Sequence, residues 1–168
     1  MTTEIPPVVK VSELFQVGIV VRDVEQSMKH YRSLLGIDKW MPFTVGPSMA
    51  HMTYRGKPSQ HSFKAAFAMA GPMMIELLQP LEGDGIYREF LRENGEGVHH
   101  LGHVRVDDLD KAVQAMEAAG FPCIESGEPV DQLTGAHGWA YVDTTAVLGY
   151  ILELSCGSDP RELFAARG

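Results

Sequence analysis

The sequence predicts an α+β fold in which two βαβββ modules in tandem form curved mixed sheets around a shared cleft. The first observation is a weak internal repeat, in which QVGIV at 16–20 aligns with HLGHV at 100–104. The same repeat aligns MIELL at 74–78 with ILELS at 151–155. The second observation is that each copy reads as a strand, a helix and then about three short β segments. This order favours helices packed against a mostly antiparallel sheet.

The first module, residues 12–80, is expected to begin with an apolar strand at 14–21 that leads into a helix. Asp23 is the expected N-cap, with Gln26 at capping-box spacing, and Gly36 ends the helical pattern. The apolar residues at helical intervals are Val24, Met28, Tyr31 and Leu35. The β segments expected after the helix lie around residues 39–44, 50–54, 63–69 and 73–78.

The second module, residues 98–156, repeats this order after a linker at 81–97. The linker is expected to hold a short amphipathic helix at 85–94. Asp108 is the expected cap of the second module's helix, which Gly120 ends. The apolar residues at helical intervals here are Leu109, Val113 and Met116. The later β segments are expected around residues 122–125, 138–142 and 150–154.

The bulk properties predict one soluble domain in a reducing, cytoplasmic setting. The chain has 168 residues, of which 45% are hydrophobic and 21% charged, with a formal net charge of −8. This charge disfavours nucleic acid and anionic membranes as partners, and no apolar run reaches the roughly 18 residues of a membrane span. The two cysteines form no disulfide or zinc pattern, and residues 1–11 read as an arm without a secretory signal. The tail at 157–168 is expected to form one helical turn.

The repeat also pairs metal-ligand side chains. Gln16 aligns with His100, and Glu76 aligns with Glu153. Two modules related by a two-fold axis would bring these four donors to one point in the cleft. Two carboxylates balance a divalent cation, and the amide and imidazole complete a mixed set that suits Zn²⁺, Co²⁺, Ni²⁺ or Mn²⁺. We therefore expect one divalent ion in the cleft and no other cofactor.

Strand alternation gives further expectations for this site. Gln16 and Gly18 lie on one face of their strand, as do His100 and Gly102, so these glycines are expected to leave room for substrate above the metal. His99, by alternation, is expected to point away from the ligands. A buried structural Glu is the plain alternative to a ligand, but Glu inside an apolar strand is costly unless its charge is compensated. Further histidines expected in loop-like or edge regions are His51, His61 and His137, the last a candidate at the pocket mouth.

Two longer phrases, GEGVHHLGHVRVDDLDKAVQAMEAAGF at 95–121 and IELLQPL at 75–81, resemble methylmalonyl-CoA epimerase-like proteins of the vicinal oxygen chelate (glyoxalase/bleomycin resistance/dioxygenase) superfamily. The resemblance covers about residues 12–156 and makes the second histidine of the HH pair, His100, the ligand. The order Gln, Glu, His, Glu is similar to the ligand set of some glyoxalase I enzymes. An extradiol dioxygenase needs two histidines and one carboxylate, so that activity is disfavoured.

The resemblance implies an isomerase that abstracts a proton next to a carbonyl, in an acyl-CoA thioester or a carbonyl acid, through a metal-stabilised enolate. Glu153 or Glu76 would be the catalytic base, and a homodimer is the family expectation. The alternatives are a glyoxalase I (lactoylglutathione lyase)-type enzyme and a non-catalytic, small-molecule-binding resistance-type protein.

The chain departs from both enzyme patterns. The strand at 61–69 lacks the epimerases' further catalytic Glu, and Val20 stands where the glyoxalases have an Arg for glutathione. The nearest candidates for contacts with CoA phosphates are Arg55, Lys57 and Lys64.

Overall fold

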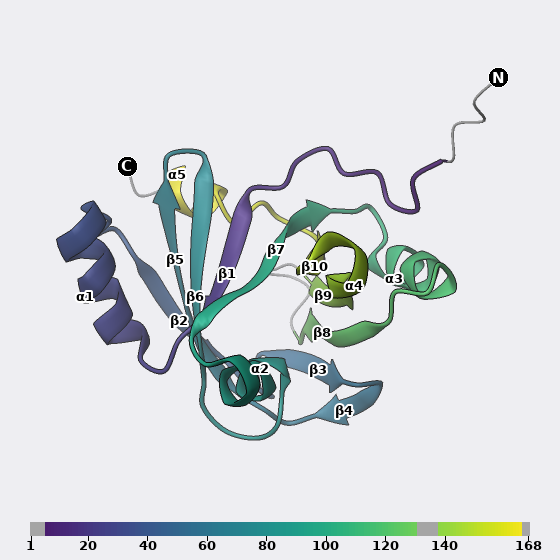
Figure 1. The fold of residues 1–168 in the computed structure, drawn as a ribbon, viewed down its shortest axis with the longest axis horizontal. Coiled ribbons are helices and arrows are strands. Elements are labelled where there is room, and N and C mark those ends of the chain that lie inside the picture. Colours follow the sequence, from purple (N-terminus) through teal and green to yellow (C-terminus); the bar gives the residue numbers. More distant parts are fainter. Residues whose placement is uncertain (1–5, 131–137, 166–168) are drawn as a thin grey trace.

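The computed structural model describes residues 6–130 and 138–165, which form one curled sheet flanked by helices (Figure 1). The expected α+β class with a curved mixed sheet is confirmed. The strands are β1 Gln16–Val20, β2 Met41–Val45, β3 Ala50–Tyr54, β4 Lys57–Ser59, β5 Phe63–Ala70, β6 Met73–Pro80, β7 Gly97–Arg105, β8 Cys123–Pro129, β9 Gly138–Asp143 and β10 Ile151–Cys156. The helices are α1 Val24–Leu35, α2 Ile86–Asn94, α3 Leu109–Ala118, α4 Thr145–Leu148 and α5 Glu162–Ala165.

The sheet repeats one arrangement on either side of its centre. Its ten strands in the described ranges run in the order β2-β5-β6-β1-β7-β10-β9-β8-β3-β4. At the centre β1 and β7 are antiparallel, and each pairs in parallel on its other side, β1 with β6 and β7 with β10. The remaining strands of each half are antiparallel neighbours. The four central strands β6, β1, β7 and β10 are therefore the four that carry the predicted metal ligands.

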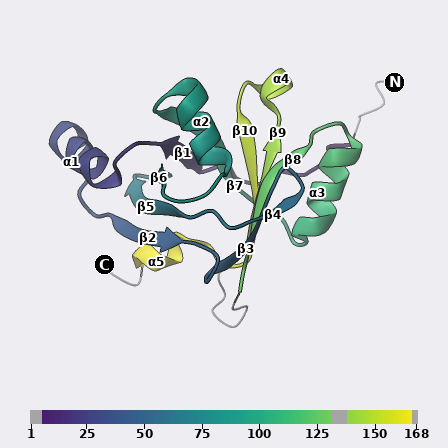
Figure 2. The same cartoon turned by 90° about the horizontal axis from the view of Figure 1, so that it is seen from below.

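The hairpin β3–β4 differs from the expected arrangement. The strand at 50–54 was expected within the first module, but β3 pairs with β8 of the other half, with Ala50 opposite Pro129 and Tyr54 opposite Glu125 (Figure 2). The strand β4 was not predicted and extends the sheet beyond β3. A local β pattern does not specify its partner, and here a long-range contact, Thr53 Oγ1 to Ser126 Oγ at 2.8 Å, joins the two strands.

The helices α1 and α3 occupy equivalent places on the two halves and lie at opposite ends of the molecule (Figure 1). Their caps are as predicted: Asp23 accepts a hydrogen bond from the Gln26 amide at 2.9 Å, and Asp108 accepts one from the Lys111 amide at 3.0 Å. The apolar side of α1 packs with Val17, Ile19, Val21, Ile75 and Leu77. The apolar side of α3 packs with Val104, Ala140, Val142, Leu152 and Leu154. The helices therefore cover the sheet face opposite the predicted ligands.

The helix α2 is held by a buried polar cluster. Glu125 of β8 is fully buried and accepts the amide hydrogen of Ile86, at the start of α2, at 2.9 Å. Its other carboxylate oxygen lies 3.4 Å from Nε2 of His61, whose Nδ1 lies 2.8 Å from Ser59 Oγ. His61 lies in the segment between β4 and β5, as expected, but it is buried, with only 3% of its surface exposed. The cluster joins α2 to strand β8 of the second half and places Tyr87 of α2 in the core.

Candidate metal centre

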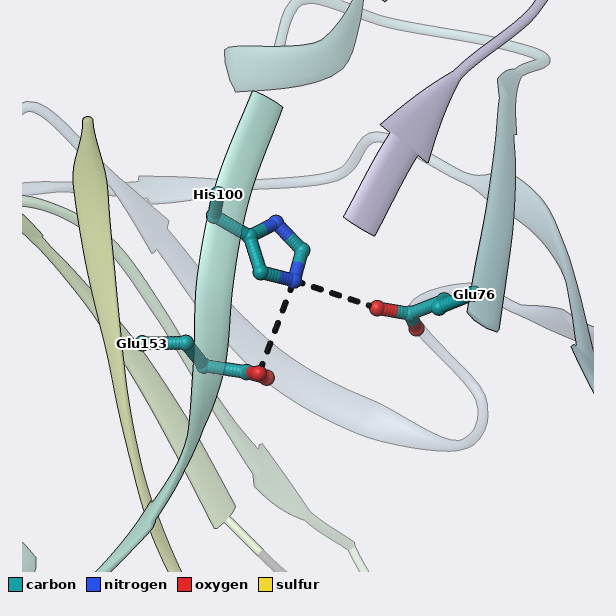
Figure 3. A group of neighbouring side chains, drawn as sticks. All are labelled: Glu76, His100 and Glu153. Carbon is teal, nitrogen blue, oxygen red and sulfur yellow. Dashed lines mark ion pairs between the residues drawn. The ribbon is translucent and has the colours of Figure 1, made fainter. Parts of the chain in front are cut away.

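The structure brings the four predicted donors together in the middle of the sheet. Gln16 comes from β1, Glu76 from β6, His100 from β7 and Glu153 from β10. Their exposed fractions are 2%, 6%, 0% and 4%, so all four are buried. Figure 3 shows Glu76, His100 and Glu153 pointing toward one another from three strands. Within the described residues, these three form the one group of acidic, histidine or cysteine side chains spaced to hold a metal ion.

The amide nitrogen of Gln16 lies at the centre of this group. It donates hydrogen bonds to Glu76 Oε2 at 2.7 Å and to Glu153 Oε2 at 2.9 Å, and it lies 3.2 Å from His100 Nε2. The imidazole nitrogen is 3.3 Å and 3.5 Å from the same two carboxylate oxygens. The partly positive amide group thus stands in for a cation among three ligand atoms. Rotation of the amide would turn its oxygen inward, so the residues fit a divalent ion with mixed oxygen and nitrogen ligands.

Burial sets the charge of the site. It raises the pKa of Glu76 to about 8, although the hydrogen bond from Gln16 acts in the opposite direction. Burial also lowers the pKa of His100, against the attraction of Glu153. Near neutral pH the imidazole is therefore uncharged and free to bind a metal, while Glu76 holds a proton until a cation replaces it.

Two glycines have a different role from the one expected. A Cβ atom on Gly18 would lie 1.9 Å from Cε1 of His100, and one on Gly102 would lie 2.2 Å from Oε2 of Glu153. The β1–β7 register places Gly18 opposite His100 and Gln16 opposite Gly102. The expectation that these glycines leave room for substrate was therefore wrong. They leave room for the donor side chains of neighbouring strands.

His99 is a site residue that strand alternation misplaced. The β1–β7 register passes from Gly18 opposite His100 to Ile19 opposite Val98, so His99 is the extra residue of a β-bulge. Its side chain is buried instead of pointing away, and its Nδ1 lies 2.9 Å from Nδ1 of His100. When His100 binds a metal through Nε2, its Nδ1 carries the hydrogen and donates it to His99, which fixes the ring orientation. The HH pair was the only sequence signal for this contact.

A cavity of about 160 Å³ opens over three of the predicted donors, Gln16, Glu76 and Glu153. Trp139 and Tyr141 of β9 form part of its wall, and Tyr87 comes from α2. The other lining residues are Phe43, Val45, Met49, Ala50, Phe63, Phe67 and Pro129. His137 lies outside the described residues.

The expected cations for a CoA substrate do not line the cavity. Arg55 forms an ion pair with Glu89 at 2.5 Å, and Lys64 forms one with Glu25. Lys57 lies on the exposed strand β4. All lining residues found among 6–130 and 138–165 are uncharged except the two carboxylates of the centre.

A family model described as the Glyoxalase/Bleomycin resistance protein/Dioxygenase superfamily matches residues 15–141. The chain belongs to this superfamily. The match extends from β1 into β9 and so includes Gln16, Glu76 and His100, while Glu153 lies beyond its end. The paired halves and the curled sheet are those of the vicinal oxygen chelate fold.

Relatives of this superfamily member include methylmalonyl-CoA epimerases. The mitochondrial enzyme of Bos taurus is 25% identical over 132 residues, 79% of this chain. The matches span just under two thirds of the curated relatives, 66% and 65% of their lengths. The Streptomyces coelicolor epimerase in complex with 2-nitronate-propionyl-CoA is similar in fold, with a TM-score of 0.62, 18% identity and coverage of 89% of this chain and 100% of that one. The Mycobacterium tuberculosis epimerase is also similar in fold, with a TM-score of 0.57 and 21% identity. That similarity covers 96% of this chain and 97% of the other.

The close approach at Gly18 gives a first prediction. Gly18→Ala should displace the His100 ring and weaken Zn²⁺ or Ni²⁺ binding by at least about tenfold, because a ligand is lost or misplaced. Gly97→Ala is the matched control, since Gly97 lies on the paired strand β7 and a Cβ atom there meets nothing within 4 Å. Competition with a chromogenic chelator measures both affinities. Equal affinities in the two variants would contradict the role assigned to Gly18.

His99 gives a second prediction. His99→Phe keeps a ring among Tyr87, Phe90 and Tyr141 but removes the acceptor for His100, so metal affinity should fall about 10–100-fold. His99→Asn places an acceptor oxygen near the position of Nδ1, so its metal affinity should fall less than that of His99→Phe. The same chelator competition checks both. A Phe variant that binds metal as tightly as the unmodified protein would rule out this positioning role.

The raised pKa of Glu76, about 8, gives a third prediction. Below this pH the metal must displace the Glu76 proton, so apparent affinity should rise by up to about tenfold per unit from pH 6 and level off above about pH 8. His100 adds little over this range, because its pKa is lowered. The Glu76→Gln variant has no such proton and should show a flatter profile. Calorimetric titration in buffers of different ionisation enthalpy measures both affinity and proton release, and a flat profile in the unmodified protein would contradict the assignment.

Proposed function

We propose that this protein is a divalent-metal-dependent isomerase of the epimerase type, with the ligands Gln16, Glu76, His100 and Glu153. The observation that carries the proposal is the buried Glu-His-Glu group with the Gln16 amide at its centre, at one end of a cavity. The relatives named methylmalonyl-CoA epimerase support the reaction type. The reaction would remove a proton from the carbon next to a carbonyl group and return it to the opposite face of that carbon or to a neighbouring carbon.

The residues of the cavity suit this chemistry. A bound divalent ion would polarise the substrate carbonyl and stabilise the negative charge that develops as the proton leaves. Glu153 and Glu76 are the carboxylates that line the cavity, and either can take the proton. We assign it to Glu153, which lies opposite Tyr141 in the β9–β10 register and so beside the uncharged phenol wall. The apolar walls exclude water from the group that receives the proton.

The described cavity wall holds no base beyond the two carboxylates of the metal centre. On β5 the side chains that face the cavity are Phe63 and Phe67, and Phe67 is the residue opposite Glu76. Lys64 pairs with Glu25 of α1 instead. The proton would therefore be returned by one of these two carboxylates. The carboxylate that removed it can deliver it to a neighbouring atom, and the other carboxylate can deliver it to the opposite face of the same carbon.

The second candidate is a glyoxalase I-type reaction. The two Glu ligands are compatible with it, because one carboxylate can move a proton between neighbouring carbons. Val20, which stands at the position of the expected glutathione-binding Arg, is fully buried in the apolar core. Because Val20 and the uncharged walls offer no cation for the carboxylates of glutathione, we rank a glutathione adduct below other carbonyl compounds as the substrate. A resistance-type binding protein is third, since four converging donors are more than simple binding requires.

No helix within the described ranges is long and apolar enough to cross a membrane. A small-molecule substrate belongs to the proposal, and the homodimer and the cytoplasmic location stay predictions.

The proposal predicts exchange of the substrate's α-proton with solvent deuterium. Glu153→Gln keeps the side-chain shape and an oxygen ligand but removes basicity, so exchange should fall about 10²–10⁴-fold in metal-loaded protein. Glu76→Gln is the matched comparison and should lose less. Proton NMR in D₂O follows exchange in methylmalonyl-CoA, in the hemithioacetal of methylglyoxal and glutathione, and in 2-hydroxyacetophenone. Undiminished exchange in Glu153→Gln would show that Glu153 is not the base and would assign that role to Glu76. If the unmodified protein exchanges none of the three substrates, the proposed function is overturned.

A further inference from the structure

We propose that the cavity selects an uncharged carbonyl compound whose carbonyl carries an apolar group the size of a phenyl ring. This inference rests on the proposed function, because it places the carbonyl at the metal centre. It differs from a malonyl-type substrate, whose acyl group carries a free carboxylate.

The size and walls of the cavity give the first argument. Its volume is about 160 Å³, and an apolar cavity of about 150 Å³ is enough to bind benzene. Part of its wall is formed by four apolar side chains, Phe43 and Val45 of β2 and Phe63 and Phe67 of β5. Further apolar lining residues are Met49, Ala50, Pro129 and Trp139. Such walls favour an aromatic or branched apolar group over a small polar one.

The charges give the second argument. The described lining residues include no Lys, Arg or His, and the carboxylates Glu76 and Glu153 are the charged groups present. Two carboxylates balance a divalent ion, so the loaded centre would keep no net positive charge. A free carboxylate on the substrate would then be buried without a counter-charge, which is costly. An uncharged substrate meets no such cost.

The polar atoms beside the apolar walls are uncharged donors. The hydroxyl groups of Tyr87 and Tyr141 hydrogen bond to each other at 2.7 Å, and burial raises the pKa of both phenols, so they stay neutral. Nε1 of Trp139 is buried and has no hydrogen-bond partner among the described residues. A Cβ atom on Gly127 would lie 2.1 Å from Cζ2 of Trp139, so the glycine makes room for this indole. The aromatic wall thus holds no charged group that could pair with an anionic substrate.

Three ligands separate size from charge: 2-hydroxyacetophenone is aromatic and neutral, mandelate is aromatic and anionic, and hydroxyacetone is small and neutral. Calorimetric titration of metal-loaded protein should show 2-hydroxyacetophenone binding at least about tenfold more tightly than either of the others. In Trp40→Phe protein, Trp139 is the one tryptophan left of the chain's two, and its fluorescence should change on binding. Equal or tighter binding of mandelate or hydroxyacetone would overturn the inference.

Two variants test the walls directly. Ala50→Leu adds volume inside the cavity and should weaken 2-hydroxyacetophenone at least about tenfold while leaving hydroxyacetone unchanged. Met49→Lys adds a cation at an exposed lining position and should strengthen mandelate, whereas Met73→Lys, also exposed but outside the cavity, should not. A Met49→Lys variant that leaves mandelate unchanged would contradict the charge argument.

The outcomes also separate this inference from the proposed function. Tight binding of 2-hydroxyacetophenone without deuterium exchange in any substrate would leave the cavity's selectivity standing and remove the isomerase activity. Exchange in methylmalonyl-CoA without binding of 2-hydroxyacetophenone would support the isomerase activity and overturn the proposed selectivity of the cavity.

Discussion

The antiparallel pairing of β1 with β7 is the constraint on which the rest of the structure depends. It places Gln16 opposite Gly102 and Gly18 opposite His100, so that a donor from each half lies across from a glycine of the other half. A slip of one residue would turn Gln16 or His100 to the face covered by α1 and α3, because side chains alternate along a strand. The parallel neighbours β6 and β10 then bring Glu76 and Glu153 to the same point. The convergence of the four donors thus depends on the register of the central strands. The helices and outer strands pack around these strands.

The internal repeat was sufficient to predict the four converging residues and both helix caps, because these depend on local pattern and on equivalence between the copies. Three features needed the folded chain. The bulge that turns His99 inward arises from the pairing of two strands about 80 residues apart in sequence. The partner of β3 and the steric role of Gly18 are likewise long-range facts. Local sequence patterns carry the element types and faces, but they do not carry pairing partners or close approaches between strands.

The molecule compensates buried carboxylates in two different ways. Glu125 is fully buried but has a backbone amide at the start of α2 and the ring of His61 beside it. Glu76 and Glu153 share the two hydrogens of a single amide group, with an uncharged imidazole next to them. The first arrangement holds one carboxylate beside a helix start, with its second oxygen 3.4 Å from the His61 ring. The second brings two carboxylates and an imidazole to one amide group, and this convergence is what suits an added cation.

The β3–β4 hairpin has a consequence for the order of assembly. Its residues precede those of β8 by about 70 positions, and among the described strands β3 pairs with β4 and β8 alone. During synthesis the β3 edge of the hairpin would therefore stay unpaired until β8 has been synthesised. The wall formed by Met49 and Ala50 then closes after the first-half strands have had the opportunity to pair. Such non-local closure raises contact order and slows folding, so we expect this wall of the cavity to form late.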